Sequence, residues 1–183
     1  MTKFNVAVLV GSLRKDSCNL KLAKAIAKLG KDHLDLHILS IGELPLFNQD
    51  LESHFPAAAT TLKNKVVEAD AILFVTPEYN RGVSGVLKNA IDWISRPYGQ
   101  NSFSKKPGAL CGASVGSIGT ACAQNALKST LNYLEIALMG QPEVYLHFKE
   151  NLIDVDGNIS DAGTEKFLQG FTNQFIAWIQ QHK

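Results

Sequence analysis

The chain has 183 residues, of which 45% are hydrophobic and 19% charged, and its formal net charge is +1. This composition is typical of a globular chain, and a domain takes about 100–200 residues, so we expect one domain over residues 1–183. A net charge so close to zero argues against binding to nucleic-acid phosphates or a membrane surface, and against an electron carrier that docks by charge.

The apolar runs of the chain are too short to cross a membrane. The longest, such as 6–10 and 71–75, have five residues, whereas a transmembrane helix needs about 20. The first run is also shorter than the roughly 7–15 apolar residues of a secretory leader. Three cysteines without a CxxC pair argue against a disulfide framework. We therefore expect a protein of the reducing cytoplasm.

Apolar runs alternate with helical patterns along the whole chain. Consecutive apolar residues predict strands that are buried on both faces, at 6–10, 36–39, 71–75, 109–113 and 144–147. Apolar residues at helical spacing predict helices at 20–29, 60–67, 86–94, 127–138 and 167–179. Strand and helix repeated in this way predict parallel strands with right-handed crossovers, and hence a three-layer α/β sandwich.

The first loop at the carboxyl edge of this sheet is GSLRKDSCN, residues 11–19. Ligands of open α/β sheets bind at that edge, where the strand order reverses. The loop offers hydroxyl, guanidinium and amide donors, on Ser12, Arg14, Ser17 and Asn19. Beside the free N–H groups of a helix start, these donors suit a compact dianion such as a terminal phosphate. The alternative is a polar connection in which Ser17 or Asn19 caps the helix.

The same loop excludes several nucleotide- and phosphate-binding classes. It has neither the GxGxxG pattern of a dinucleotide site nor the GK[ST] of a P-loop NTPase. A low-molecular-weight tyrosine phosphatase needs an arginine after its nucleophilic cysteine, and neither Cys18 nor Cys111 has one at that offset. A receiver domain needs an aspartate at the end of its third strand, where this chain has Thr76.

The second loop, TPEYNRG at residues 76–82, follows the third predicted strand. Pro77 stiffens the chain there, Gly82 permits a positive φ, and Ser84 is placed to cap the next helix. Backbone N–H groups in such a loop can meet the heteroatom edge of a planar ring, and Tyr79 adds apolar surface. The second loop is therefore a candidate binding site for a flat ligand.

Weaker signals come from the neighbouring segments. The third loop, SVGSIGT at residues 114–120, has small residues that let a ligand approach the backbone. Trp93 is expected to be buried under its helix, and Lys88 and Asp92 to be solvated or paired rather than catalytic. The five histidines are dispersed, so no metal site is predicted.

Together these loops resemble a known family. Residues 11–19 look like the phosphate loop of the NAD(P)H-dependent FMN reductases, a family that includes bacterial quinone, chromate and azo-dye reductases. TPEYN at 76–80 and LKNAIDW at 87–93 resemble its second signature. The match extends over nearly the whole chain. It implies a flavodoxin-like fold with a five-stranded parallel sheet in the order 2-1-3-4-5, and FMN where strands 1 and 3 part, as in flavodoxin itself.

The resemblance also implies which residues contact FMN. The phosphate would be held by Ser12, Arg14, Ser17 and Asn19, with Leu13 in the same loop. The edge of the isoalloxazine ring would be lined by Pro77, Glu78, Tyr79 and Asn80. The opposite side would be bordered by Ser114, Gly116, Ser117 and Gly119. No residue is expected to be a general acid or base, because the flavin carries the chemistry.

The activity implied by the resemblance is a two-electron oxidoreductase. NADPH or NADH would deliver a hydride and leave, and a quinone or similar acceptor would then take the same place, in a ping-pong cycle. Free flavins, azo dyes and chromate are further candidate acceptors. The alternatives are a flavodoxin-type one-electron carrier, which the net charge of +1 disfavours, and a flavin-free protein of the same fold.

The resemblance further implies a homodimer, with a homotetramer as the larger alternative. The apolar stripes of 86–94 and 127–138 could pack two subunits together, or both could face their own sheet. Two positions depart from the family pattern. Ser84 stands where relatives often carry a proline, and Cys122 where many carry an arginine, which weakens the case for the polar contacts of a tetramer.

Overall fold

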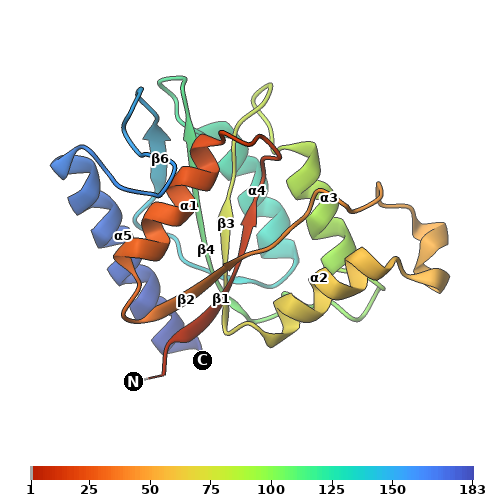
Figure 1. Ribbon diagram of the computed structural model, residues 1–183. Helices are drawn as coiled ribbons and strands as arrows, with labels where there is room; N and C mark the ends of the chain where they lie inside the picture. The colour runs from red at the N-terminus through yellow and green to blue at the C-terminus, as the bar shows by residue number, and fades with distance from the viewer. Residues whose placement is uncertain (1) are drawn as a thin grey trace.

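The computed structural model describes residues 2–183 and shows a parallel sheet between two layers of helices (Figure 1). The strands are β1 (Phe4–Val10), β2 (Leu34–Ile38), β3 (Ala71–Val75), β4 (Pro107–Ser114), β5 (Ala137–Leu138) and β6 (Val144–His147). The helices are α1 (Cys18–Leu29), α2 (Ala57–Glu68), α3 (Gly85–Ile94), α4 (Ala121–Tyr133) and α5 (Ala162–His182), with a 3₁₀ helix η1 (Gln49–His54). The predicted strand order, β2-β1-β3-β4-β5, is confirmed.

The central strands are buried on both faces, which explains their unbroken apolar sequences. Side chains alternate along β1, so that Val6 and Val8 face α1 and α5 while Ala7 and Leu9 face α2, α3 and α4. Two apolar cores, one on each side of the sheet, hold the helices in place. No helix among residues 2–183 has the length and apolar composition that a membrane span requires.

The sheet has one strand more than the five expected. β5 pairs with the start of β4 at Pro107–Gly108, and β6 pairs with its end at Cys111–Ser114. Two short strands therefore share the fifth place. The residues between them include Gly140 and Pro142, and proline has no N–H to donate to the ladder, so one continuous strand cannot form there.

The helix expected over 127–138 is shorter than predicted. The apolar residues that suggested it run past the end of α4. Leu134 is the C-cap of α4, and Leu138 belongs to β5. Leu127 and Leu131 remain on the helix, and both are buried against the protein's own sheet. The apolar stripe of α3 lies in the same core. These two stripes therefore provide no surface for a second subunit.

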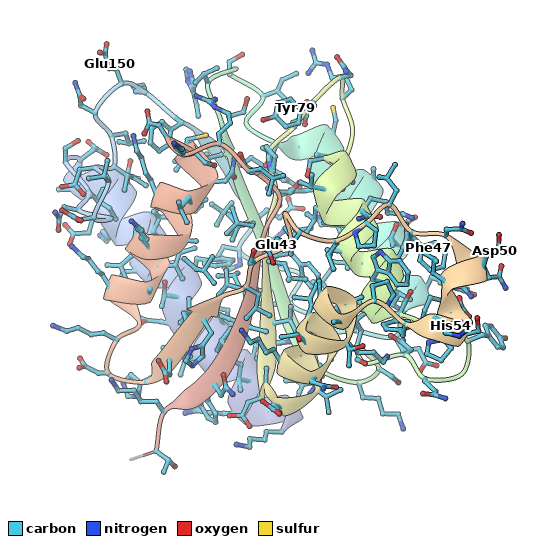
Figure 2. All side chains as sticks on the ribbon, turned by 45° about the vertical axis from the view of Figure 1, so that its right-hand side comes forward. Glu43, Phe47, Asp50, His54, Tyr79 and Glu150 are labelled. Atoms are coloured by element: carbon cyan, nitrogen blue, oxygen red, sulfur yellow. The ribbon has the colours of Figure 1, made fainter. Side chains whose placement is uncertain are left out.

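Between β2 and α2 the chain forms an arm, residues 44–56, that lies against α3 (Figure 2). Trp93 is buried as expected, and Phe47 of the arm contacts it edge-on with ring centroids 5.0 Å apart. The indole N–H donates to the Pro45 carbonyl (2.8 Å), and the Asn89 amide donates to the same oxygen (2.9 Å). Part of the LKNAIDW motif thus anchors the arm.

Helices in this fold run antiparallel to the strands they follow. The carboxyl ends of β1, β3 and β4 and the N-termini of α1, α3 and α4 consequently meet at one edge of the sheet, at the top of Figure 1. The three loops identified in the sequence lie at that edge.

Candidate functional site

The first loop begins with a sharp corner at Gly11, whose N–H donates to Val75 O (2.9 Å). A Cβ on Gly11 would lie 2.7 Å from Ser84 Oγ and 2.9 Å from Pro77 Cδ. Contacts this short are not tolerated, so glycine is needed for the first loop to pack directly on the second.

The segment that leads into α1 carries groups of the kind that bind anions. Ser17 is the N-cap, and its hydroxyl accepts from Leu20 N (3.3 Å). Asp16 is paired with Lys21 (2.5 Å), whereas the exposed Arg14 guanidinium forms no ion pair within residues 2–183. The N–H groups of residues 15–17 likewise donate no hydrogen bond within the described chain. A free guanidinium and free amides at a helix N-terminus fit a dianion.

Asn19 is oriented differently from the other donors. Its side chain is 1% exposed and turned toward β4. Its Nδ2 donates to Ala113 O and its Oδ1 accepts from Ala113 N, each at 2.9 Å. The Asn19 amide is therefore engaged with the end of a strand.

The second loop contains a tight turn. Tyr79 and Gly82 exchange backbone hydrogen bonds of 3.0 and 3.3 Å, and φ is 52° at Asn80 and 63° at Arg81. Gly82 would permit a positive φ but does not adopt one, since the two preceding residues make the turn. Successive positive φ values are typical of type I′ turns, in which asparagine is favoured. The turn leaves Tyr79 exposed, in the upper part of Figure 2.

Glu78 joins the second loop to the segment after the third. Its side chain is 8% exposed, and Oε2 accepts from the backbone N–H of Ala123 (3.0 Å). Thr120 is the N-cap of α4, but its side chain makes no capping hydrogen bond to the helix backbone. The carboxylate of Glu78 thus caps α4 from a different loop, where it also interacts favourably with the helix dipole.

The first two loops enclose a cavity of about 460 Å³. It is lined by Gly11, Ser12, Leu13, Arg14, Tyr79, Ser84, Gly85 and Val86. Ser84 occupies the N-cap position of α3 as expected, but its side chain makes no capping bond. Its Oγ is buried and has no partner within residues 2–183. An unpartnered buried hydroxyl beside a cavity fits a polar ligand.

Residues 84–86 were not among the predicted contacts. The sequence feature that could have identified them is the position of Ser84, directly before a helix and next to the second loop.

The third loop lies close to the neighbouring backbone. Gly119 has φ of +64°, and a Cβ there would lie 2.6 Å from the Tyr145 carbonyl carbon. The Ser114 hydroxyl accepts from Gly116 N (3.2 Å), while Gly116 and Ser117 are exposed. Small residues thus leave the backbone of this loop accessible to a ligand.

Other candidates lie away from this edge. Lys88 and Asp92 form the expected pair, with Nζ 2.7 Å from Oδ1. A larger hollow of about 880 Å³ lies between α3 and α4, and its lining includes none of the predicted contacts. Within residues 2–183 no group of three or more His, Cys, Asp or Glu side chains is placed to hold a metal ion.

The arrangement fits FMN at the carboxyl edge. A dianion site at α1, a cavity beside Tyr79 and an accessible backbone in the third loop match a phosphate joined to a flat, polar-edged ring. Asn19–Ala113 and Glu78–Ala123 connect the three loops, so the parts of the site lie together.

Comparisons with known proteins agree with this geometry. The sequence profile of the NADPH-dependent FMN reductase family matches residues 4–151. The chain is 49% identical over 178 residues to 2-hydroxy-1,4-benzoquinone reductase of Burkholderia sp, covering 97% of each. It is 44% identical over 181 residues to a quinone reductase of Pseudomonas putida, covering 98% of this chain and 97% of the relative.

The same likeness extends to solved structures. FerB, a flavoenzyme NAD(P)H:(acceptor) oxidoreductase of Paracoccus denitrificans, superposes with a TM-score of 0.94 at 47% identity, covering 98% of both chains. A flavodoxin-like protein of Agrobacterium tumefaciens superposes at 0.59 with 19% identity, covering 99% of this chain and 100% of the other, which supports the fold alone. The chain therefore belongs to the NADPH-dependent FMN reductase family and is an FMN-dependent oxidoreductase.

Proposed function

We propose that this protein transfers two electrons from NADPH or NADH to a quinone in a ping-pong cycle, with FMN held at the carboxyl edge of the sheet. The observation that carries the proposal is the cavity between the first and second loops, beside the dianion site of α1. The relatives named quinone reductases support the choice of acceptor. When bound, FMN supplies the hydride chemistry, and the protein supplies binding and orientation.

The chain's own groups divide the work of binding. Ser12, Arg14 and Ser17 would hold the phosphate end, where α1 presents its free amides. Pro77, Glu78, Tyr79 and Asn80 would form one side of the ring site. Ser114, Gly116, Ser117 and Gly119 would form the other. Amide N–H groups of these loops that face the ring would stabilise negative charge on it.

A shared place for donor and acceptor is part of the proposal. Small-molecule pockets typically measure about 300–1,000 Å³, and the cavity of about 460 Å³ lies in the lower part of that range. The flavin ring itself would occupy this cavity. Nicotinamide and quinone would then meet the one exposed face of that ring in turn, which is the ping-pong order.

The one-electron carrier is disfavoured at the site as well as by composition. A carrier that docks by charge needs a surface of one sign around its ligand to meet the opposite sign on a partner. Here the carboxylate of Asp16 is paired with Lys21, which lowers the Asp16 pKa, and the Glu78 carboxylate is turned inward to cap α4. The loops therefore present no free acidic group in the first or second motif for a partner protein.

Two measurements test the proposal. Protein stripped of flavin should regain yellow colour when titrated with FMN. Initial rates with NADPH or NADH and a benzoquinone, each varied against the other, should give parallel double-reciprocal lines. A colourless protein after FMN addition contradicts the cofactor site, and intersecting lines contradict the ping-pong order. FMN binding without quinone-dependent turnover would support the carrier instead.

We further infer that two chains associate through the outer groove between α3 and α4. The groove measures about 880 Å³, and Tyr98 and Tyr133 on its wall are 85% and 78% exposed. Large exposed aromatic side chains beside a hollow favour an interface. Sedimentation velocity should show a dimer that Tyr133→Glu dissociates. A wild-type monomer would contradict the inference, and a four-chain species would extend it to the tetramer.

We also propose that the protein works in the reducing cytoplasm. Cys18, Cys111 and Cys122 are all free thiols, and burial raises the pKa of both Cys18 and Cys111. A protein without disulfides is typical of that compartment. Cell fractionation with a tagged full-length chain tests this, and recovery outside the cytoplasm would contradict it.

A further inference from the structure

The crevice of the sheet begins where β3 ends. β3 lies between β1 and β4, and its last backbone bond to β4 joins Thr76 N to Cys111 O (2.9 Å). β4 continues to Ser114. In a parallel strand, every second residue directs both its N–H and its C=O to the same side. Ala113, two residues beyond Cys111, therefore directs both groups into the crevice that β3 has left.

Asn19 fills the place of the missing strand. Its side-chain carbonyl accepts from Ala113 N and its side-chain N–H donates to Ala113 O, both at 2.9 Å. An amide side chain has the same donor and acceptor as a peptide group. The pair is buried and joins residues 94 apart in the sequence. Removing the side chain would leave Ala113 N without a partner and Ala113 O with only the Cys18 thiol, 3.6 Å away, which is costly in a buried site.

The two partners of this contact belong to opposite ends of the site. Asn19 lies in the first turn of α1, at the end of the first loop. Ser17 of that loop is the N-cap of α1. Ala113 directly precedes the third loop, residues 114–120. β4 packs closely against the end of β3 beside Ala113, because a Cβ on Gly112 would lie 2.2 Å from Thr76 O. One side chain thus connects the phosphate end to the ring end.

We propose that Asn19 is a positioning residue that couples the phosphate loop to the third loop, so that filling either end of the FMN site favours filling the other. The inference rests on the proposed FMN site. A phosphate on the N-terminus of α1 orders its first turn, and the two hydrogen bonds of Asn19 extend that order to Ala113 and the loop after it. The second group then binds to a partly ordered site.

The experiment separates the two ends of the ligand. Riboflavin has the ring without the phosphate, and inorganic phosphate supplies the other part. Riboflavin affinity of the flavin-stripped full chain is measured by fluorescence quenching, without phosphate and at saturating phosphate. Couplings between sites are typically about 5- to 150-fold. We expect an increase in riboflavin affinity of about 5-fold or more for the wild type, and none for Asn19→Ala.

Two control variants isolate the coupling. Asn101 also bridges backbone groups, because its Nδ2 donates to Leu134 O (2.8 Å) and its Oδ1 accepts from Phe103 N (3.0 Å). It lies at the other edge of the sheet, so Asn101→Ala should lower stability and keep the phosphate effect. Arg14→Ala should require more phosphate for saturation but reach the same increase.

The possible outcomes are distinct. An unchanged phosphate effect in Asn19→Ala overturns the inference, as does a wild type that binds riboflavin equally with and without phosphate. A wild type that binds neither riboflavin nor FMN overturns the proposed function as well. If Asn19→Ala fails to fold, hydrogen exchange of the wild type decides. Phosphate alone should slow exchange of the Ala113 amide, and an unchanged rate overturns the coupling.

Discussion

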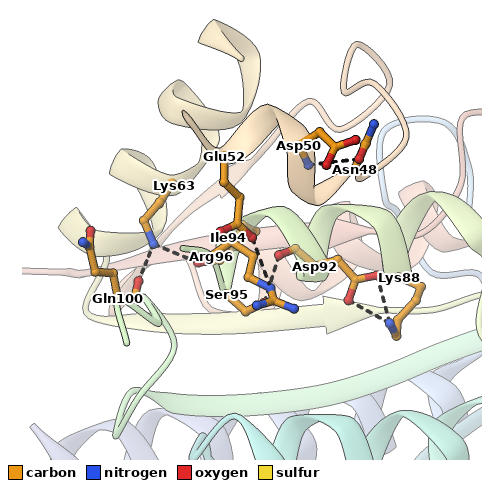
Figure 3. A network of polar contacts seen from close by, with 10 residues as sticks. All are labelled: Asn48, Asp50, Glu52, Lys63, Lys88, Asp92, Ile94, Ser95, Arg96 and Gln100. Carbon is orange, nitrogen blue, oxygen red and sulfur yellow. Dashed lines mark hydrogen bonds and ion pairs between the residues drawn. The ribbon is translucent and has the colours of Figure 1, made fainter. Parts of the chain in front are cut away.

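The two edges of the sheet differ in how many of their backbone polar groups have hydrogen-bond partners within the protein. At the amino edge, helix C-termini are closed by lysines. Lys106 donates to Val67 O and Ala69 O (3.0 and 2.7 Å) at the end of α2. Lys63 donates to Ile94 O (3.0 Å) at the end of α3 (Figure 3). Burial lowers the pKa of both lysines, because their ammonium groups are partly withdrawn from water.

At the carboxyl edge Ser17 caps α1 and Glu78 caps α4, but other polar groups stay without a partner within residues 2–183. Residues 15–17 keep their N–H groups free within the described chain, and Ser84 does not cap α3. The difference indicates that the two edges have different roles. The amino edge satisfies its polar groups internally and contributes to stability, whereas the carboxyl edge leaves polar groups for a ligand. Substitutions at the two edges should therefore affect stability and FMN affinity separately.

The largest effect on stability is expected at Gly112, in β4. In Gly112→Ala the new Cβ would lie 2.2 Å from Thr76 O, a backbone atom that cannot move aside. We expect a loss of unfolding free energy of about 3 kcal/mol, as in severe overpacking. Gly170, in α5, has no atom within 4 Å of such a Cβ. In urea denaturation, Gly170→Ala should gain about 0.5–1 kcal/mol. Equal stabilities would contradict the account.

The next effect tests the amino edge. Lys106→Met removes two hydrogen bonds from a partly buried ammonium to helix-terminal carbonyls. We expect a loss of about 1–2 kcal/mol in unfolding free energy with FMN affinity unchanged. The exposed neighbour Lys105 is the control, since Lys105→Met should change neither quantity. A large change in the FMN dissociation constant of Lys106→Met would break the separation of the two edges.

Arg14→Ala tests the carboxyl edge, where we expect FMN affinity to change and stability to stay the same. A charge-assisted hydrogen bond contributes about 1.5–3 kcal/mol, so FMN should bind roughly 10- to 150-fold more weakly while the melting temperature of the flavin-free chain stays the same. Lys15→Ala, in the same exposed loop, serves as the charge-matched control and should have a smaller effect. Unchanged FMN affinity in Arg14→Ala would remove this residue from the phosphate site.

The smallest effect is expected at Ser84, whose buried hydroxyl has no partner within residues 2–183. Ser84→Ala removes an unsatisfied group, so the flavin-free chain should gain up to about 1 kcal/mol. If FMN supplies the missing partner, its affinity should fall by up to about 10-fold, the value of one neutral hydrogen bond. Both are measured by thermal unfolding and flavin titration. Lower stability with unchanged affinity would show that the hydroxyl has a structural role.

The features that the sequence predicted are those with a local or periodic signal. Strands buried on both faces appear as unbroken apolar runs, and Ser17 stands where a helix cap belongs. The fold and the three loops follow from such patterns. β5 could not be predicted, because its two residues, Ala137–Leu138, are too few to show a period. The helix predicted over 127–138 extended too far because apolar residues continue beyond the end of α4 into the turn that leads to β5.

Contacts between distant segments left no such signal. Asn19 looked like a phosphate ligand from its neighbours in the loop, yet its partner Ala113 lies 94 residues away. Glu78 is likewise 45 residues from Ala123, whose N–H it accepts. A hydrogen bond to backbone needs no particular residue type at the other end, so no sequence pattern marks it. The three loops that carry the resemblance lie at one edge of the sheet, and the structure shows how they are joined.

The central claim is that FMN at the carboxyl edge takes electrons from the nucleotide and then passes them to the quinone. Sequential stopped-flow mixing without oxygen tests it most directly. The visible flavin absorbance of the FMN-loaded chain should disappear on mixing with NADPH or NADH, and should return when a benzoquinone is added in the second mix. Absorbance that neither nucleotide bleaches, or that the quinone does not restore, would contradict the claim.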